Sequence, residues 1–372
     1  MPYQRLPDVN HIPWKRRVAL ELYRGYRKLL QRSPNLNYLF WECTLRCNLD
    51  CMHCGSDCLR ESTLPDMPKE DFLAVLDSLQ GKVDPKQTII VVTGGEPLMR
   101  ADFEECGKEF QKRGFPWGFV TNGYAMTPER FQRLVASGCK SMTVSLDGLE
   151  ASHDHFRGRA QSYRRAMETI RMAANTPGLT FDVVTCVNQQ NLPELPKMRE
   201  LLISLGLKRW RIATVFAKGR AKQHDILFLS DAQFAEVFEF IRETRKQGRI
   251  RANYSCEGFL GSLEGEVRDY PFFCRAGTNI ASVLVDGSIS ACPSLRADFI
   301  QGNIYRDDFW TIWRSKFQNM RDRRWMKTGA CAKCKDWKYC QGNGLHLRDE
   351  KTGDLLLCHL DRLRKAQEAA CA

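Results

Sequence analysis

Three cysteines in one short loop carry the strongest chemical signal in this sequence. Cys47, Cys51 and Cys54 have the spacing C-x3-C-x2-C and follow an apolar run at residues 38–41 that predicts a short strand. A closed structural zinc site takes four ligands, whereas this group offers three. Soft thiolates also suit iron–sulfur clusters, and three of them on four irons leave one iron open to a small chelating molecule. By itself, the triplet leaves a partial zinc site or solvent-exposed thiols as alternatives.

A second group of cysteines lies in the last third of the chain. Its members are Cys256, Cys274, Cys292, Cys331, Cys334, Cys340 and Cys358. The chain has 16 cysteines, and without an apolar export signal this number argues for metal or redox use over a disulfide framework. A pair of zinc-ribbon-like sites is the alternative for this group.

Polar motifs follow the apolar runs that predict strands. Gly94-Gly95-Glu96-Pro97 comes after residues 88–93, Asn122 follows residues 117–121, and Ser145 ends residues 141–145, with Arg157 further along. The two glycines allow a close approach to the backbone, and Glu96 adds an acceptor. A tight turn with a solvent-facing Glu96, and a surface salt bridge for Arg157, are the alternatives.

These motifs need a scaffold that brings strand ends together, and the hydrophobic pattern predicts one. Strands are expected at residues 38–41, 88–93, 117–121, 141–145, 180–187 and 208–213, and helices at 68–79, 103–112, 128–136, 163–174, 195–205 and 231–246. Six strand–helix units predict an α/β barrel or partial barrel, whose chemistry lies on loops at the C-terminal strand ends. We expect an N-terminal arm and helix (1–35), the partial barrel (36–249), a small cysteine-rich α+β domain (250–360) and a C-terminal tail (361–372).

Composition narrows the classes of partner. The 372 residues carry a formal charge of +12, which we expect to be spread over solvated helix faces and not to bind nucleic acid. No apolar run is long enough for a membrane helix, and the N-terminus lacks the apolar stretch of a signal peptide. We therefore expect a cytoplasmic protein without a membrane partner.

The triplet and the Gly94–Pro97 motif together resemble the radical S-adenosylmethionine (radical SAM) superfamily. The resemblance implies a [4Fe-4S] cluster on Cys47, Cys51 and Cys54 whose open iron binds SAM. One electron then cleaves SAM reductively, and the 5′-deoxyadenosyl radical removes a hydrogen atom from the substrate. His53 takes the position where the family usually has an aromatic ring. The family spacing excludes Cys43 and Cys58 as ligands.

The resemblance also implies roles for the strand-end residues. In the family, the motif matched by Gly94, Gly95, Glu96 and Pro97 binds the SAM amine. Ser145 and Arg157 match positions that contact the SAM ribose and carboxylate, and Asn122 lies in a strand-end motif near SAM. The resemblance does not assign a catalytic acid or base.

The second cysteine group resembles the SPASM extension of these enzymes, which holds two auxiliary [4Fe-4S] clusters. Cys331, Cys334, Cys340 and Cys358 form one complete set, whereas Cys256, Cys274 and Cys292 form an incomplete one. The position that usually supplies the missing cysteine is Gly344. Water, substrate or a side chain such as His346 could fill that place, or the cluster could be smaller or absent.

These resemblances predict an oxidoreductase that modifies a peptide or protein by crosslinking or oxidation, as peptide maturases with this extension do. We expect a flavodoxin or ferredoxin as electron donor. A sulfatase-maturase-like enzyme is less expected, because Pro293 replaces the aspartate that those enzymes have next to the hairpin cysteine. Small-molecule chemistry such as trimming a tetrapyrrole is another alternative. So is a redox or nucleic-acid-binding iron–sulfur protein without SAM turnover.

Overall fold

A single sheet runs through the protein. The computed structural model describes residues 6–255 and 257–371. The strands of the described part are β1 (Tyr38–Glu42), β2 (Ile89–Thr93), β3 (Trp117–Thr121), β4 (Cys139–Ser145), β5 (Thr180–Val187), β6 (Arg209–Thr214), β7 (Arg251–Tyr254), β8 (Ile280–Val283), β9 (Ser288–Ser290) and β10 (Gly302–Asn303). Their order in the sheet is β10-β9-β8-β1-β2-β3-β4-β5-β6-β7.

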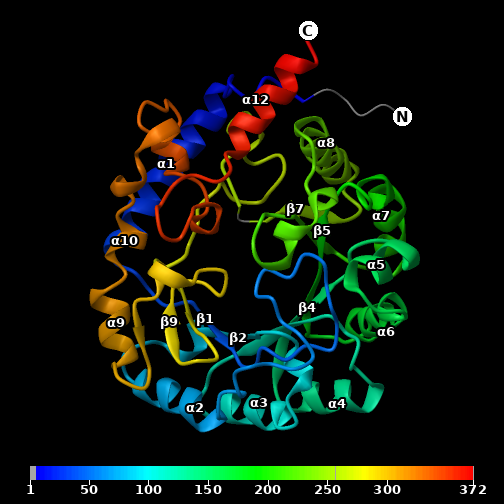
Figure 1. The fold of residues 1–372 in the computed structure, drawn as a ribbon, viewed down its shortest axis with the longest axis vertical. Coiled ribbons are helices and arrows are strands. Elements are labelled where there is room, and N and C mark those ends of the chain that lie inside the picture. The colour runs from blue at the N-terminus through cyan, green and yellow to red at the C-terminus, as the bar shows by residue number, and fades with distance from the viewer. Residues whose placement is uncertain (1–5, 256, 372) are drawn as a thin grey trace.

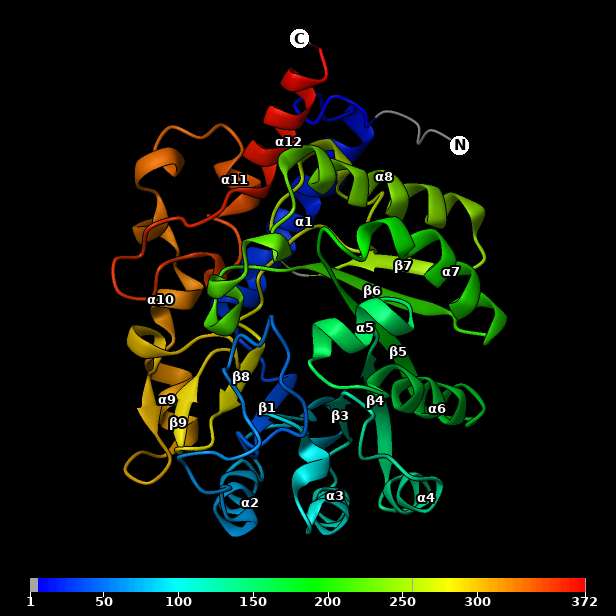
Figure 2. The same ribbon diagram turned by 45° about the vertical axis from the view of Figure 1, so that its right-hand side comes forward.

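The stretch from β1 to β7 is parallel and has helices on its outer face. The helices in chain order are α1 (Trp14–Arg32), α2 (Lys69–Ser78), α3 (Phe103–Lys112), α4 (Pro128–Ala136), α5 (Glu150–Arg157), α6 (Ser162–Ala174), α7 (Leu195–Ser204), α8 (Asp231–Gln247), α9 (Phe309–Ser315), α10 (Gln318–Arg321), α11 (Trp337–Cys340) and α12 (His359–Ala369). Figure 1 shows the strands curving around the centre, and Figure 2 shows α2, α3 and α4 in a row outside them. This arrangement confirms the predicted partial α/β barrel, since parallel strands need crossover helices.

The six predicted strands are all present, with ends that differ by two residues at most. Two elements of the barrel part were not predicted. Helix α5 lies between β4 and α6, and β7 pairs in parallel with β6 as a seventh strand.

The C-terminal part of the chain extends the sheet at its β1 edge. Strand β8 pairs in parallel with β1, and β9 returns antiparallel to β8 through a turn at Asp286-Gly287. Gly287 has φ +81°, which a side chain other than glycine rarely adopts. The C-terminal part therefore shares one sheet with the barrel strands, while the domain limits given above stay predictions.

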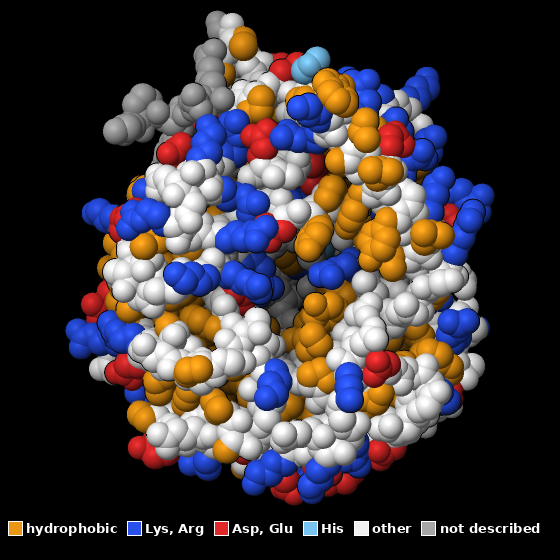
Figure 3. Space-filling view, turned by 180° about the vertical axis from the view of Figure 1, so that it is seen from behind, with side chains coloured by type: hydrophobic (Ala, Val, Ile, Leu, Met, Phe, Trp, Pro, Cys, Tyr) orange, Lys and Arg blue, Asp and Glu red, His pale blue; other side chains and the backbone are white. Residues whose placement is uncertain are grey.

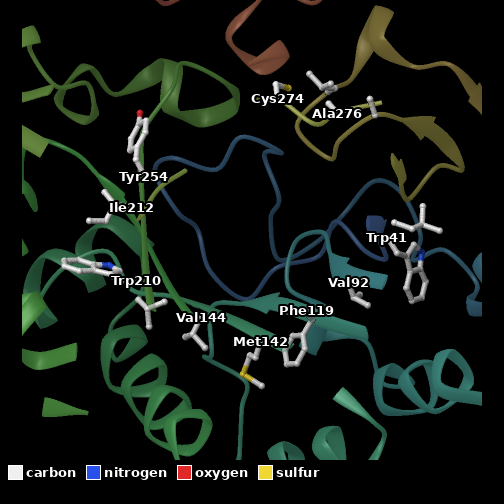
Figure 4. Close-up of a cluster of buried hydrophobic side chains, with 14 of the residues drawn as sticks. Trp41, Val92, Phe119, Met142, Val144, Trp210, Ile212, Tyr254, Cys274 and Ala276 are labelled. Atoms are coloured by element: carbon white, nitrogen blue, oxygen red, sulfur yellow. The ribbon is translucent and has the colours of Figure 1, made fainter. Parts of the chain in front are cut away.

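The core lies between the sheet and its helices. Figure 4 shows large apolar side chains of neighbouring strands, including Trp41 of β1, Val92 of β2 and Phe119 of β3. All three are almost fully buried, and Trp41 stacks on Phe72 of α2 with ring centroids 4.7 Å apart. This packing holds the strand ends at fixed positions. Among the described residues, no helix is long and apolar enough to cross a bilayer.

Candidate functional site

The cysteine loop after β1 packs against the glycine motif after β2. The Gly95 N–H donates to the Thr44 carbonyl over 2.8 Å, and the Glu96 N–H donates to the Arg46 carbonyl over 2.9 Å. A Cβ on Gly94 would lie 2.2 Å from the Thr44 oxygen, and one on Gly95 would lie 2.2 Å from the Arg46 oxygen. Glycine is therefore required at both positions for the two loops to touch, since no side chain fits between them.

Each sulfur of the predicted triplet faces an N–H donor. The donor pairs are Asn122 Nδ2 with Cys47 Sγ at 3.8 Å, Arg157 Nη1 with Cys51 Sγ at 3.6 Å, and the Cys58 backbone N–H with Cys54 Sγ at 3.3 Å. Hydrogen bonds to the sulfurs are one of the means by which proteins tune iron–sulfur clusters. The donor set therefore suits thiolate sulfurs.

Cys54 and Cys58 form a pair of unequal sulfurs. A hydrogen bond from the Cys58 side chain lowers the pKa of Cys54 to about 6. The same hydrogen bond, followed by burial, raises the pKa of Cys58 far above the usual range for a thiol. Cys54 is thus the readily ionised sulfur, and Cys58 acts as a donor to it. In the sequence, the position of Cys58 only excludes it as a ligand, and its spacing from the triplet gives no signal for this role as a donor.

Glu96 is fully buried and binds the protein instead of facing solvent. Its carboxylate accepts hydrogen bonds from the Thr121 hydroxyl at 2.7 Å, the Asn122 N–H at 2.8 Å and the Leu98 N–H at 3.2 Å. Burial raises the pKa of Glu96. The carboxylate therefore fixes the end of β3, where Asn122 reaches toward Cys47. This arrangement is not the solvent-facing turn considered as an alternative.

Arg157 and Asp147 form a buried ion pair beside the triplet. Arg157 Nε donates to Asp147 Oδ2 over 2.6 Å, and Asp147 Oδ1 accepts from the Cys186 N–H over 2.7 Å. Burial lowers the pKa of Arg157, but Asp147 and Cys51 raise it by more, so the guanidinium stays charged. Arg157 is therefore not a surface residue. Ser145 ends β4 two residues before Asp147 and is also buried.

His53 packs its ring on Phe156 of α5, with the centroids 4.1 Å apart and the planes 7° from parallel. Its Nδ1 is buried without a hydrogen-bond partner in the described structure. Burial, and then Arg157 and Arg220, hold the pKa of His53 well below its usual value, so the ring is neutral. A neutral imidazole with an unsatisfied nitrogen is suited to a polar ligand.

A cavity of about 560 Å³ opens beside this loop, a size typical of small-molecule sites. His53, Cys54 and Gly94 line one side of it, and residues 293–297 and 348–351 of the extension line another. The strand-end loop after β6 also contributes to the wall. The cavity thus lies between the triplet and the C-terminal extension.

Arg220, in the loop after β6, fastens the cysteine loop from the other side. Its Nε donates to the Cys51 carbonyl over 3.0 Å, and its Nη1 donates to Asp57 over 2.9 Å. A Cβ on Gly219 would lie 2.2 Å from the Cys54 carbonyl oxygen. This role of Arg220 was not predicted. The only signal for it in the sequence is the Gly219-Arg220 pair after a predicted strand.

The complete set of the second cysteine group lies around Arg348. Arg348 Nη2 donates to Cys331 Sγ over 3.3 Å, and the Asn343 N–H donates to Cys340 Sγ over 3.2 Å. Burial raises the pKa of Cys340 to about 12, and Cys358 and Cys331 add to that rise. Burial also raises the pKa of Cys358, and Cys331 and Cys334 add to that rise. The fold therefore brings these four predicted ligands into electrostatic contact.

Of the incomplete set, Cys274 and Cys292 lie among the described residues. Cys274 is buried; the charge of Arg323 and the Leu345 and Ala276 backbone N–H groups together outweigh burial and lower its pKa. Cys292 is half-buried against the core, and Cys256 lies outside the described residues. A Cβ on Gly344 would lie 2.6 Å from His346 Cε1, so His346 occupies the space that a side chain at 344 would need.

Among the described residues, no three His, Cys, Asp or Glu side chains gather in a way that could hold a single metal ion.

Comparison with known proteins identifies the family. The radical SAM superfamily model matches residues 41–202, and the model of an iron–sulfur cluster-binding domain, SPASM, matches residues 274–335. The AdoMet-dependent heme synthase of Nitratidesulfovibrio vulgaris is 29% identical over 336 residues, covering 86% of this chain and 90% of that protein. The mycofactocin maturase MftC of Mycolicibacterium smegmatis is 28% identical over 316 residues, covering 82% of this chain and 76% of that protein.

The fold also resembles a solved structure, native anSMEcpe with bound AdoMet. The TM-score is 0.68 at 19% sequence identity, covering 89% of this chain and 95% of the other. This likeness concerns the fold alone. The two family models and the relatives in sequence show that the chain is a radical SAM enzyme of the SPASM type.

Proposed function

We propose that the protein binds a [4Fe-4S] cluster on Cys47, Cys51 and Cys54, and binds SAM at the open iron. The observation that carries this proposal is that each of the three sulfurs faces an N–H donor, with Cys54 lining the adjoining cavity. When bound, the cluster and SAM supply a 5′-deoxyadenosyl radical that removes a hydrogen atom from substrate. The protein's own residues hold the ligands and limit access of water to the cavity.

Several residues have proposed roles in holding SAM. Arg157 keeps its charge beside Cys51 and offers it to the SAM carboxylate, which a guanidinium binds well. The backbone of Gly94 lines the cavity, with Gly95 next to it in the chain, and His53 offers its unpaired Nδ1 to the nucleotide. Asn122 and Ser145 contact the ribose side. Glu96 and Pro97 act as positioning residues, because the Glu96 carboxylate binds the end of β3 and Pro97 begins the turn after it.

The second cysteine group is proposed to hold auxiliary clusters. Cys331, Cys334, Cys340 and Cys358 supply a full set for one [4Fe-4S] cluster, with Arg348 and Asn343 as donors to its sulfurs. Cys256, Cys274 and Cys292 supply three ligands for a second cluster. His346 is the side chain placed to complete it, since its ring fills the space beside Gly344.

The substrate has two candidates. A peptide or protein is favoured by the likeness to a maturase and by the cavity's long wall of loop residues from the barrel and the extension. A tetrapyrrole with carboxylate side chains is favoured by the likeness to heme synthases and by cationic side chains in the lining, such as Lys222 and Lys351.

SAM cleavage tests the proposal directly. The protein is reconstituted anaerobically with iron and sulfide, mixed with SAM and dithionite, and assayed for 5′-deoxyadenosine. We expect the product from the wild type, none from Cys51→Ala, and retained product from the matched control Cys58→Ala. Cleavage that survives in Cys51→Ala would contradict the ligand assignment.

The auxiliary ligands and the substrate need separate readouts. Cys334→Ala should lose about four irons while keeping some SAM cleavage, because its cluster is not the one that binds SAM. Reactions with a precursor peptide and with an iron tetrapyrrole are then analysed by mass spectrometry. The compound whose mass changes is the substrate class of the enzyme.

A further inference from the structure

Helix α1 exposes large apolar residues to solvent. A surface helix normally turns its apolar stripe toward the core. Here the attached face uses charged and amide side chains: Arg27 donates to the Tyr339 carbonyl at 2.5 Å and the Lys338 carbonyl at 2.7 Å, and Gln31 donates to the Arg321 carbonyl at 2.9 Å. These hydrogen bonds, together with the buried Leu20, fix one side of α1 to the protein, and a second set of large apolar residues stays exposed.

Those apolar residues form one continuous exposed stripe, here called the α1 face. Its members are Trp14, Val18, Leu22, Tyr26 and Leu29, with exposed fractions of 70%, 52%, 72%, 54% and 63%. Their spacing of three or four residues places them on one side of the helix over four turns. Seen from behind in Figure 3, hydrophobic side chains gather with Lys and Arg at the upper right, where α1 runs. A contiguous exposed apolar patch marks an interaction site, unlike scattered exposed residues.

The charges around the α1 face are positive. Lys15, Arg17, Lys28 and Arg32 are exposed on the same helix, while its single acidic residue, Glu21, is tied to Lys338 and Arg24. A cavity of about 550 Å³ lies alongside, lined by Lys28 and Arg32 of α1 and by Arg324 of the extension. Two copies of this chain docking through α1 would bring these cations together, which disfavours a homodimer.

We propose that the α1 face binds the surface of a membrane that contains anionic lipids. The apolar stripe enters the boundary between headgroups and acyl chains, and the flanking cations meet the negative headgroups. Trp14 and Tyr26 lie toward the two ends of the stripe, and such amphipathic rings favour the headgroup level. From the sequence we expect no membrane partner, because no segment is long and apolar enough to span a bilayer. A helix that lies on the membrane surface does not require a spanning segment.

Vesicle flotation of the full-length protein tests this inference. The probes are vesicles of phosphatidylcholine alone and vesicles with about one third phosphatidylserine. We expect binding to the anionic vesicles only, weakened in 0.5 M salt because surface charges are screened. The triple variant Trp14→Ser/Leu22→Ser/Leu29→Ser and the charge variant Lys15→Glu/Lys28→Glu should each bind at least about tenfold less.

Two controls keep the result specific to α1. Lys140→Glu/Lys197→Glu makes the same change in net charge on exposed lysines of β4 and α7 and should bind like the wild type. SAM cleavage should be unchanged in all variants. The inference is overturned if the wild type ignores anionic vesicles, or if the remote charge variant loses as much binding as the α1 variant. A dimer in sedimentation velocity that disappears in the triple variant would also overturn it, in favour of a second copy.

Discussion

The buried pair of Asp147 and Arg157 gives the sharpest prediction about the site. The Asp147 side chain has no exposed surface and that of Arg157 is 9% exposed. In Asp147→Asn, an amide replaces the carboxylate that accepts from Arg157 Nε at 2.6 Å. The buried guanidinium then loses its only carboxylate partner among the described residues, which costs about 3–5 kcal/mol of the free energy of unfolding. The variant should also lose SAM cleavage, because Arg157 no longer has a fixed place beside Cys51.

Urea denaturation followed by circular dichroism measures the loss of stability. The matched control is Glu150→Gln, three residues further along the chain. Its partner is Arg164 at 2.7 Å, with side chains 50% and 68% exposed. Exposed pairs contribute about 0–1 kcal/mol, so this variant should unfold almost like the wild type. Equal losses in the two variants would refute the reasoning that burial decides the strength of the pair.

Two further predictions concern the loop contacts and the remaining thiols. Gly95→Ala should lower the free energy of unfolding by about 1–3 kcal/mol and reduce iron uptake by the triplet, because the new Cβ would overlap the Arg46 carbonyl. The control is Gly25→Ala in α1, which has open space around it and should stabilise the protein slightly. Iodoacetamide should modify the exposed Cys371 but not Cys106 in the folded protein at any pH from 7 to 9. Burial raises the pKa of Cys106 to about 12, so its thiolate fraction at pH 9 is about one thousandth. Modification of Cys106 that increases with pH while the protein is still folded would contradict this expectation.

The sequence predicted the strands well because buried parallel strands have a simple signal. Residues 88–93 are a continuous apolar or β-branched run, residues 180–187 are such a run interrupted by Asp182, and both form strands. Helix α5 was not predicted because Glu150 to Arg157 has one large apolar residue, Phe156, and no apolar period. Its stability comes from tertiary contacts: His153 Nδ1 accepts from the Asp147 N–H at 3.0 Å, and Phe156 stacks on His53.

The order of the cysteines along the chain was enough to predict the family, since ligand spacing within one loop is a local property. What each neighbouring group does there depended on the fold. Glu96 binds the end of β3 instead of facing solvent, Cys58 donates to Cys54, and Arg220 fastens the loop from a strand far along the chain. The Cys58 contact lies within one loop but depends on how that loop is folded, whereas the contacts of Glu96 and Arg220 join segments distant in sequence. Only the packing of the sheet determines which strand ends meet.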